Sequence, residues 1–258
     1  MLSLASSPRR RYLYFDIVLP FNQLFGFIYV ILTGYLFNTM GRGIKWPDKS
    51  GTNRDDVQNY GGVNLHGMFM SSALVFIQGE ALLSYRLYRY DAKLLSKFIH
   101  FSFHILAIAL FLTGFSAIVV QKNYLGLSHF TSVHSWIGLS VMFIYIVQFT
   151  FGFVSFFIAG INDETRTKFM PVHQTVGALL FAVSIAQAII GFVQYDDLYN
   201  RLYGNDGCPT DREAPLVCGD YKFVYNFAII FCVLYALTLL FLVVPPIWRR
   251  KKTEEETQ

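Results

Sequence analysis

The chain has 258 residues, of which 54% are hydrophobic and only 15% are charged. Water-soluble domains average about 45–50% apolar and about 25% charged residues, so this composition excludes an ordinary soluble domain and favours a membrane protein. The net charge of +4 is small, and the positive residues gather at the ends of hydrophobic runs, which argues against a nucleic-acid partner.

Six hydrophobic segments are each long enough to cross a bilayer, since a spanning helix needs about 20 mostly apolar residues. In chain order they are 13–37, 64–85, 98–120, 134–159, 172–193 and 223–244. The first is the least regular because it contains Asp16, Pro20 and Asn22. The residues before it lack the apolar region of a cleavable signal peptide, so we interpret it as an uncleaved anchor.

These segments predict an all-α membrane protein with six transmembrane helices. We expect a single domain over 1–258, with a core at 13–248 and short tails. The two longest connections, 41–62 and 194–222, are rich in Gly, Asp and Asn and predict turns and irregular structure.

The distribution of positive charge predicts the orientation in the membrane. Most Lys and Arg residues lie in the two tails and in the loops after the second and fourth segments. Positive residues favour the cytoplasmic side, so we expect both termini and these two loops there. The tails carry no clear sorting motif, and plasma, secretory-vesicle and endolysosomal membranes are all compatible with the sequence.

Two of the three cysteines, Cys208 and Cys218, fall in the long non-cytoplasmic connection. An oxidising compartment would allow a disulfide between them. Cys232 lies inside the sixth segment, where we expect it only to pack.

Four histidines sit at matching ends of four hydrophobic segments. His66, His100 and His134 are evenly spaced along the chain, and His173 follows after a slightly longer interval. Successive membrane helices run in opposite directions, so His66 and His134 should lie near the non-cytoplasmic face, with the other two near the cytoplasmic face. Imidazole is a common axial ligand of haem iron, and facing helices of a bundle can hold a cofactor between them. The pattern predicts two iron porphyrins roughly 20 Å apart across a hydrocarbon core of about 30 Å.

Other interpretations of these histidines are weaker. A single histidine in an apolar segment is usually a hydrogen-bonded core residue, but four that pair by depth are harder to explain by packing. Zinc is disfavoured because neither pair has a third or fourth ligand. Proton relays of a transporter are the remaining alternative, although we find in the second to fifth segments neither the mid-depth charges nor the interruptions that transporters show.

Four further polar residues lie close to this pattern. His104 is one turn beyond His100 on the same helical face and could replace it as a ligand, but the regular spacing favours His100. We interpret His104 as a neighbour that hydrogen-bonds or packs against the porphyrin, and His129 as a solvated loop residue or, alternatively, a substrate contact. Gln148 and Gln187 sit mid-helix, where each amide needs a haem propionate, a water or a neighbouring helix as its partner.

Three stretches match a known family. Residues 81–89 read ALLSYRLYR, residues 132–136 read SVHSW, and residues 97–104 read KFIHFSFH. With the histidine spacing, they resemble the cytochrome b561 family of transmembrane ascorbate-dependent oxidoreductases, whose stretches read ALLVYRVFR, SLHSW and K-x-x-H-x-x-x-H. The resemblance covers about 13–248. The chain departs from the family at Thr131, where relatives often have tyrosine, and in its longer connection at 194–222.

The resemblance implies that helices two to five form a four-helix bundle around two b-type haems, in a homodimer. It implies that His100 and His173 ligate the cytoplasmic haem and that His66 and His134 ligate the other. Electrons would pass from cytoplasmic ascorbate to a non-cytoplasmic acceptor, either monodehydroascorbate or ferric iron. A quinone-linked di-haem membrane cytochrome is the nearest alternative, but a cationic inner mouth favours a water-soluble anionic donor.

The resemblance also implies where the donor and acceptor bind. Cations attract and orient the ascorbate anion, and the matching positions near the cytoplasmic pair are Arg86, Lys93, Lys97 and Arg166. The alternative is that these residues anchor the protein at lipid headgroups, which we expect for Arg89 and Lys168. The corresponding non-cytoplasmic positions are Lys122, Asn123, Ser132 and Trp136. Acidic residues of the 194–222 connection could attract a ferric complex or could be ordinary solvated turn residues.

Overall fold

A computed structural model describes residues 8–49, 53–158, 162–203 and 217–248, and every regular element in these ranges is helical. The first crossing is α1 (Pro8–Thr39), and the second is built from α2 (Gly61–Ser71), η2 (Ser72–Ile77) and α3 (Gln78–Leu87). The third is α4 (Lys93–Tyr124), and the fourth is α5 (Val133–Gly152) with its continuation η3 (Phe153–Phe157). The fifth is α6 (Asp163–Tyr203), and the sixth is α7 (Val217–Val243). Two short 3-10 helices, η1 (Val57–Tyr60) and η4 (Pro246–Trp248), complete the set.

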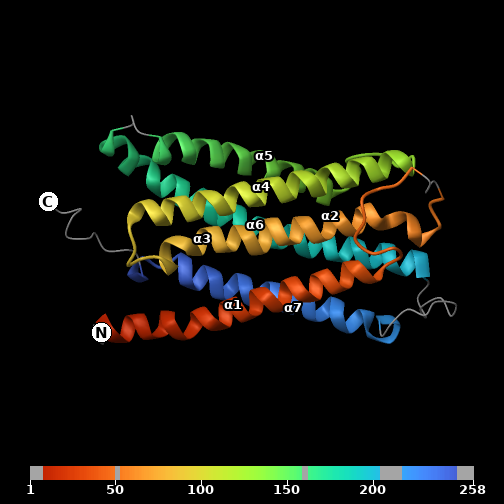
Figure 1. The fold of residues 1–258 in the computed structure, drawn as a ribbon, viewed down its shortest axis with the longest axis horizontal. Coiled ribbons are helices and arrows are strands. Elements are labelled where there is room, and N and C mark those ends of the chain that lie inside the picture. The colour runs from red at the N-terminus through yellow and green to blue at the C-terminus, as the bar shows by residue number, and fades with distance from the viewer. Residues whose placement is uncertain (1–7, 50–52, 159–161, 204–216, 249–258) are drawn as a thin grey trace.

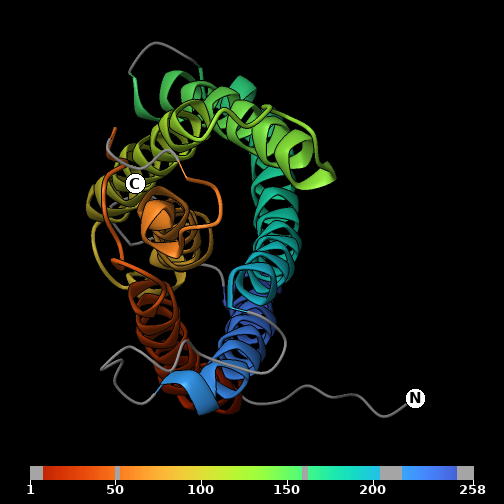
Figure 2. The same ribbon diagram turned by 90° about the vertical axis from the view of Figure 1, so that its right-hand side faces the viewer.

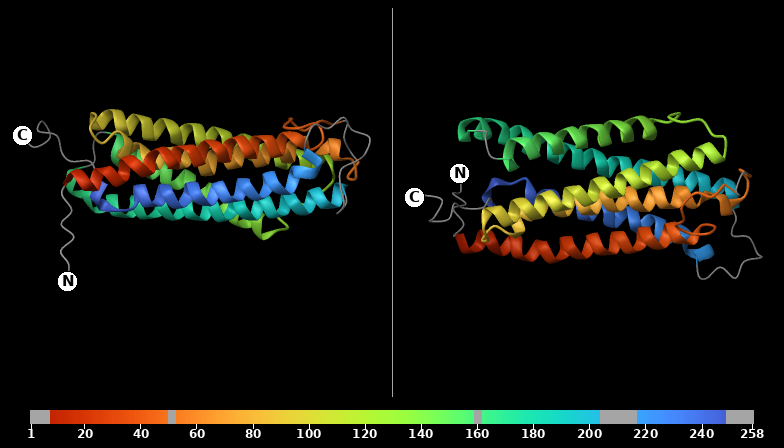
Figure 3. Two further views of the ribbon diagram at one scale, coloured as in Figure 1. Left: turned by 90° about the horizontal axis from the view of Figure 1, so that it is seen from below. Right: turned by 45° about the horizontal axis from the view of Figure 1, so that its top comes forward.

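Six of these helical stretches are long and apolar enough to cross a membrane, which confirms the predicted number of crossings. All run along the long axis of the molecule (Figure 1 and Figure 3). The start of α1 and the end of α7 lie at the same end of the bundle (Figure 1), as an even number of crossings requires.

Helix α1 is continuous through Pro20, and two of its polar side chains, Asp16 and Asn22, contact other parts of the chain. The buried Asn22 amide donates a hydrogen bond of 3.0 Å to the main-chain carbonyl of Tyr235 on α7. Asp16 pairs with Arg89 at 3.3 Å, just beyond the end of α3. The polar residues that make the first segment irregular in sequence therefore connect α1 to its neighbours.

The crossings pack as neighbouring pairs, with α1 against α7, the second crossing against α4, and α5 against α6. Seen end-on, α1 and α7 lie at one side, α4 and α5 at the other, and the second crossing and α6 between them (Figure 2). An aromatic core that includes Tyr29, Phe192 and Tyr235 fills the space between α1, α6 and α7. A second apolar cluster joins the second crossing with α4, α5 and α6.

Helix α6 has 41 residues and extends well beyond the predicted 172–193 at both ends. Its polar ends are stabilised by ion pairs between residues one turn apart. Arg201 pairs with Asp197 at 3.1 Å, and Lys168 pairs with Glu164 at 2.6 Å. Pairs at this spacing stabilise helices. The expectation of irregular structure throughout 194–222 is therefore wrong, because residues up to Tyr203 are helical.

Candidate functional site

The structure brings the four spaced histidines together as two pairs. The rings of His66 on α2 and His134 on α5 have their centres 6.2 Å apart. The rings of His100 on α4 and His173 on α6 have theirs 6.4 Å apart. We call these the 66/134 pair and the 100/173 pair. The crossings that carry the 66/134 pair run antiparallel to those that carry the 100/173 pair. Each histidine lies near the start of its crossing or, in α6, of its apolar part, so the two pairs lie toward opposite ends of the bundle.

The ring separations fit a haem iron held within each pair. An imidazole nitrogen lies about 2.0–2.1 Å from a bound first-row metal, and the ring centre lies about 1.1 Å behind it, so two opposed ligands place their ring centres roughly 6.3 Å apart. The separations of 6.2 and 6.4 Å match this value. Two axial imidazoles suit a b-type haem that transfers electrons.

Every Nδ1 of these rings already makes a polar contact. The partners are the Gly114 carbonyl for His66 (3.1 Å), the Ala81 carbonyl for His100 (2.7 Å), the Gln187 amide for His134 (2.9 Å) and the Gln148 amide for His173 (2.9 Å). Such contacts fix the orientation of a ligating ring and leave Nε2 as the nitrogen for the metal. The neighbouring-helix alternative for the two glutamines is thus the one that the structure shows.

Between the two pairs the bundle is packed with apolar side chains. Each of the four crossings contributes a buried residue seven positions after its histidine, namely Ala73, Ala107, Val141 and Leu180. The Phe111 and Tyr145 rings meet edge to face in the same cluster, with centres 5.4 Å apart. This layer separates the two histidine levels.

His104 lies beside the 100/173 pair and contacts Tyr145. Its Nδ1 is 2.5 Å from the Tyr145 hydroxyl, and its ring meets the His100 ring edge-on at 4.4 Å. The structure therefore places His104 as a packing and hydrogen-bonding neighbour of His100.

Two of the predicted cytoplasmic cations bind main-chain carbonyls at the end of α5 and η3. Lys97 Nζ donates to the Phe156 carbonyl at 2.9 Å, and Arg166 donates to the Ile158 carbonyl at 3.3 Å. Lys93 and Arg166 are both within electrostatic reach of Lys97. The Phe156 ring also contacts the His173 ring, with centres 5.2 Å apart. These three cations therefore lie close to the 100/173 pair.

The two arginines of the ALLSYRLYR stretch contact other elements. Arg86 donates to the carbonyls of Val243 (2.6 Å) and Pro245 (3.3 Å), and so caps the C-terminal end of α7. Arg89 is buried beside Asp16 and over the Phe15 ring, 4.2 Å from its centre. Both side chains have structural roles at the same end of the bundle.

On the opposite end, the SVHSW stretch begins α5. The Ser132 hydroxyl accepts a hydrogen bond from the Ser135 main-chain N–H at 3.2 Å, which is an N-cap contact. Trp136 is 60% exposed, with its ring centre 6.0 Å from that of Phe130. Ser132 thus places His134 in the first turn of its helix.

The remaining predicted residues of that end lie in the last turn of α4 and in the loop that follows it. Lys122 donates to the Ser128 carbonyl at 3.2 Å and lies within electrostatic reach of both His66 and His134. Asn123 and His129 contact each other at 2.8 Å. Lys122 is therefore the predicted outer residue with a direct electrostatic link to the 66/134 pair.

Two predictions for the 194–222 connection fall largely outside the described residues. Cys208 and the side chain of Cys218 are not described, so the expected disulfide stays a prediction. Of the acidic residues expected there, Asp196 pairs with Lys222 and Asp197 with Arg201. Cys232 is a buried free thiol in α7.

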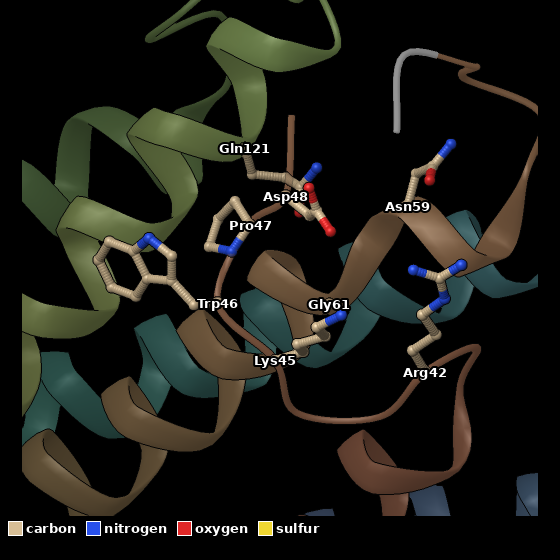
Figure 4. Close-up of a pocket in the computed structure, with 8 residues that line it drawn as sticks. All are labelled: Arg42, Lys45, Trp46, Pro47, Asp48, Asn59, Gly61 and Gln121. Carbon is tan, nitrogen blue, oxygen red and sulfur yellow. The ribbon is translucent and has the colours of Figure 1, made fainter. Parts of the chain in front are cut away.

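Two features escaped the sequence analysis. Glu80 is a charged residue inside the second crossing, next to Ala81 at the level of the 100/173 pair, and it accepts hydrogen bonds of 3.0 Å from Gln23 and the Tyr235 hydroxyl. A small cleft of about 20 Å³ lies where the α1–α2 connection meets the end of α4 (Figure 4). Its lining residues are Arg42, Lys45, Trp46, Pro47, Asp48, Asn59, Gly61 and Gln121. The two basic residues in a glycine-rich connection were its only sequence signal.

Comparison with known proteins places this geometry in a family. The family model described as eukaryotic cytochrome b561 matches residues 65–196, which is half of the chain. A Caenorhabditis elegans homolog of the transmembrane ascorbate-dependent reductase CYB561 is 29% identical over 253 residues, covering 94% of this chain and 87% of the nematode protein.

Two vertebrate relatives extend the comparison. The human transmembrane ascorbate-dependent reductase CYB561 is 34% identical over 171 residues, which cover 66% of this chain and 64% of the human protein, just under two thirds of its length. The plasma membrane ascorbate-dependent reductase CYBRD1 of Xenopus tropicalis is 28% identical over 243 residues, covering 93% and 79%. The chain belongs to the eukaryotic cytochrome b561 family.

Proposed function

We propose that this protein carries electrons across a membrane, from ascorbate at the end of the 100/173 pair to an acceptor at the end of the 66/134 pair. The observation that carries the proposal is the presence of two histidine pairs at opposite ends of one bundle, each at the separation expected for iron ligation. When bound at each pair, a b-type haem supplies a one-electron iron couple. The names of the relatives, which are ascorbate-dependent reductases, support ascorbate as the donor.

The donor end attracts and orients an anion. Lys97 and Arg166 each use a donor on a carbonyl, but an ammonium has three donors and a guanidinium five. The Arg166 Nε is buried without a hydrogen-bond partner among the described residues. Lys93 adds a third charge, and Arg86 adds positive charge from the end of α7. We therefore assign ascorbate to this cationic group.

The middle of the bundle keeps the two levels apart and dry. The layer that contains Ala107, Phe111 and Val141 is buried. At a rise of about 1.5 Å per residue, the roughly 14 residues between the two histidine levels span about 21 Å. Such a separation, filled by side chains, lets charge cross without admitting water.

At the acceptor end, Lys122 and Asn123 end α4, and Ser132 and Trp136 lie at the start of α5, the helix of His134. We propose that monodehydroascorbate or a ferric complex is reduced there, with Lys122 favouring an anionic form. The concentration of Lys and Arg at the opposite end supports a cytoplasmic location for that end and for both termini. The family resemblance supports a homodimer, and plasma, secretory-vesicle and endolysosomal membranes are all compatible with the sequence.

Haem content tests the proposal directly. His173→Ala should remove the haem of the 100/173 pair and block reduction by ascorbate, because that level faces the donor. His134→Ala should remove the other haem and leave reduction by ascorbate in place. Each variant should retain about half of the pyridine-haem absorbance of the unaltered protein, with His129→Ala as a control that retains all of it. Purified protein without haem would refute the proposed function.

A further inference from the structure

An internal repeat relates the helices α5 and α6. Gln148 follows His134 at the same interval at which Gln187 follows His173. A glycine comes four positions later in each helix, at Gly152 and Gly191. The two helices are consecutive, antiparallel and packed together (Figure 1), so each repeat unit faces the other in the reverse direction.

The contacts of the repeat are crossed between the helices. Gln148, on the helix of His134, places its amide nitrogen 2.9 Å from His173 Nδ1 and donates to the His173 carbonyl at 2.7 Å. Gln187, on the helix of His173, makes the same two contacts with His134. Each amide therefore holds both the ring and the main chain of a histidine on the neighbouring helix.

The repeated glycines make room for these rings. A Cβ at Gly152 would lie 2.9 Å from His173 Cε1, and a Cβ at Gly191 would lie 3.0 Å from His134 Cε1. Each ring thus contacts both a glycine backbone and a glutamine amide of the same neighbouring helix.

The other two crossings obey the same rule with main-chain groups. Gly114, whose carbonyl contacts His66, follows His100 at the interval that separates Gln148 from His134. Ala81, whose carbonyl contacts His100, follows His66 at an interval longer by a single residue. The extra residue is accounted for by the π-helical turn of η2 (Ser72–Ile77), which lies between His66 and Ala81. Each of the four histidine-bearing crossings therefore carries a proposed ligand for one level and the Nδ1 partner for the other.

We infer that Gln148 and Gln187 are positioning residues that set haem midpoint potentials. Each acts on the level that does not contain the histidine of its own helix. Gln148 acts on the 100/173 level through His173, and Gln187 acts on the 66/134 level through His134. The inference rests on the proposed function, because it requires iron at both levels.

The chemistry follows from the amide. A histidine that ligates through Nε2 commonly carries its proton on Nδ1, and the acceptor of that proton governs how strongly the ring donates electrons to the metal. In the observed orientation each amide nitrogen faces Nδ1 and donates to the main-chain carbonyl of the same histidine. A half-turn of the last side-chain bond would present the amide oxygen to Nδ1 as an acceptor, in place of that main-chain hydrogen bond. The Gln187 oxygen is buried without a partner among the described residues. The second histidine of each level, His66 or His100, contacts a main-chain carbonyl instead. The glutamine is therefore the side chain whose substitution can change the midpoint potential of that level.

Exchange of each glutamine for glutamate tests the crossed assignment. A carboxylate accepts more strongly and adds negative charge, so it should favour the ferric over the ferrous state of the affected level by about tenfold, which is about 59 mV for one electron. Q148E should lower the midpoint potential of the 100/173 level alone, and Q187E that of the 66/134 level alone. Potentiometric titration of the full-length haem protein measures both, with the levels identified by the His173→Ala and His134→Ala variants.

Each variant serves as the control for the other, and Q194E provides the same charge change at an exposed position of α6. Q194E should move neither potential by a comparable amount. If a glutamate variant fails to retain haem, Q148M and Q187M keep the side-chain length without the hydrogen bonds, and the low-spin electron paramagnetic resonance signal of the opposite level alone should shift. The inference would be overturned if each variant shifted only the level that contains the histidine of its own helix, or if potentials and signals were unchanged. Either result would leave the proposed function intact. Absence of haem from the unaltered protein would instead remove the function on which the inference depends.

Discussion

At the scale of single residues, the atoms behind the histidine rings decide what those rings can bind. All four Nδ1 atoms are engaged, so the Nε2 atoms of each pair are the ones that would bind iron. The pairing of the histidines was predictable because it needs only helix spacing and alternating direction. The partners of Gln148 and Gln187 were not, since an amide at mid-depth can bond to several kinds of group and sequence does not distinguish them.

Charge removal at the donor end should weaken ascorbate use selectively. Lys97→Ala removes an ammonium group and its positive charge beside the 100/173 pair. A loss of about 1 kcal/mol in ascorbate binding corresponds to a roughly fivefold lower affinity. The rate of reduction at low ascorbate should fall by about that factor, whereas reduction by dithionite should be unchanged. Stopped-flow absorbance at the haem band measures both rates.

The control for this charge change is Lys168→Ala, since Lys168 is exposed and paired with Glu164 on the same stretch of α6. Arg86 should matter less for ascorbate than Lys97, because its guanidinium caps α7. Equal slowing with ascorbate and dithionite in the Lys97 variant would count against an ascorbate site there.

At the scale of elements, the register of each crossing matters more than its exact ends. The apolar segments were predictable because hydropathy detects them, and the second segment at 64–85 corresponds to a crossing at 61–87. The full length of α6 was not predictable, because its polar ends depend on ion pairs such as that of Arg201 with Asp197, which hydropathy does not detect. The π turn of η2 also leaves no pattern in a single sequence.

The π turn makes a prediction about deletions. Removing Ser72 should convert the turn to α-helix and leave Ala81 facing His100, because the turn already holds one surplus residue. Removing Ile105, which is exposed on the α-helical α4, should rotate Gly114 by about 100° away from His66. Haem content per chain should be kept in the first variant and reduced in the second. Equal loss in both would show that the turn does not absorb the difference in spacing.

At the scale of the whole molecule, two histidine levels lie across a bundle whose ends differ in charge. The number of crossings and the pairing by depth followed from the sequence, because both depend on apolar length and alternation. Which helices are neighbours could not be predicted from the residues alone. Nothing in their pattern indicates that α1 packs on α7 or that the second crossing contacts both α4 and α6. The pairing of Arg86 with the end of α7 follows from that arrangement.

Transfer through a sealed membrane tests the central claim most directly. Liposomes containing the purified protein are loaded with ascorbate, and reduction of a ferric chelate added outside is followed by absorbance. We expect external reduction well above that of protein-free liposomes, and near-background reduction with His134→Ala, although ascorbate should still reduce the remaining haem of that variant. External reduction by the unaltered protein no faster than in protein-free liposomes would contradict electron transfer across the membrane.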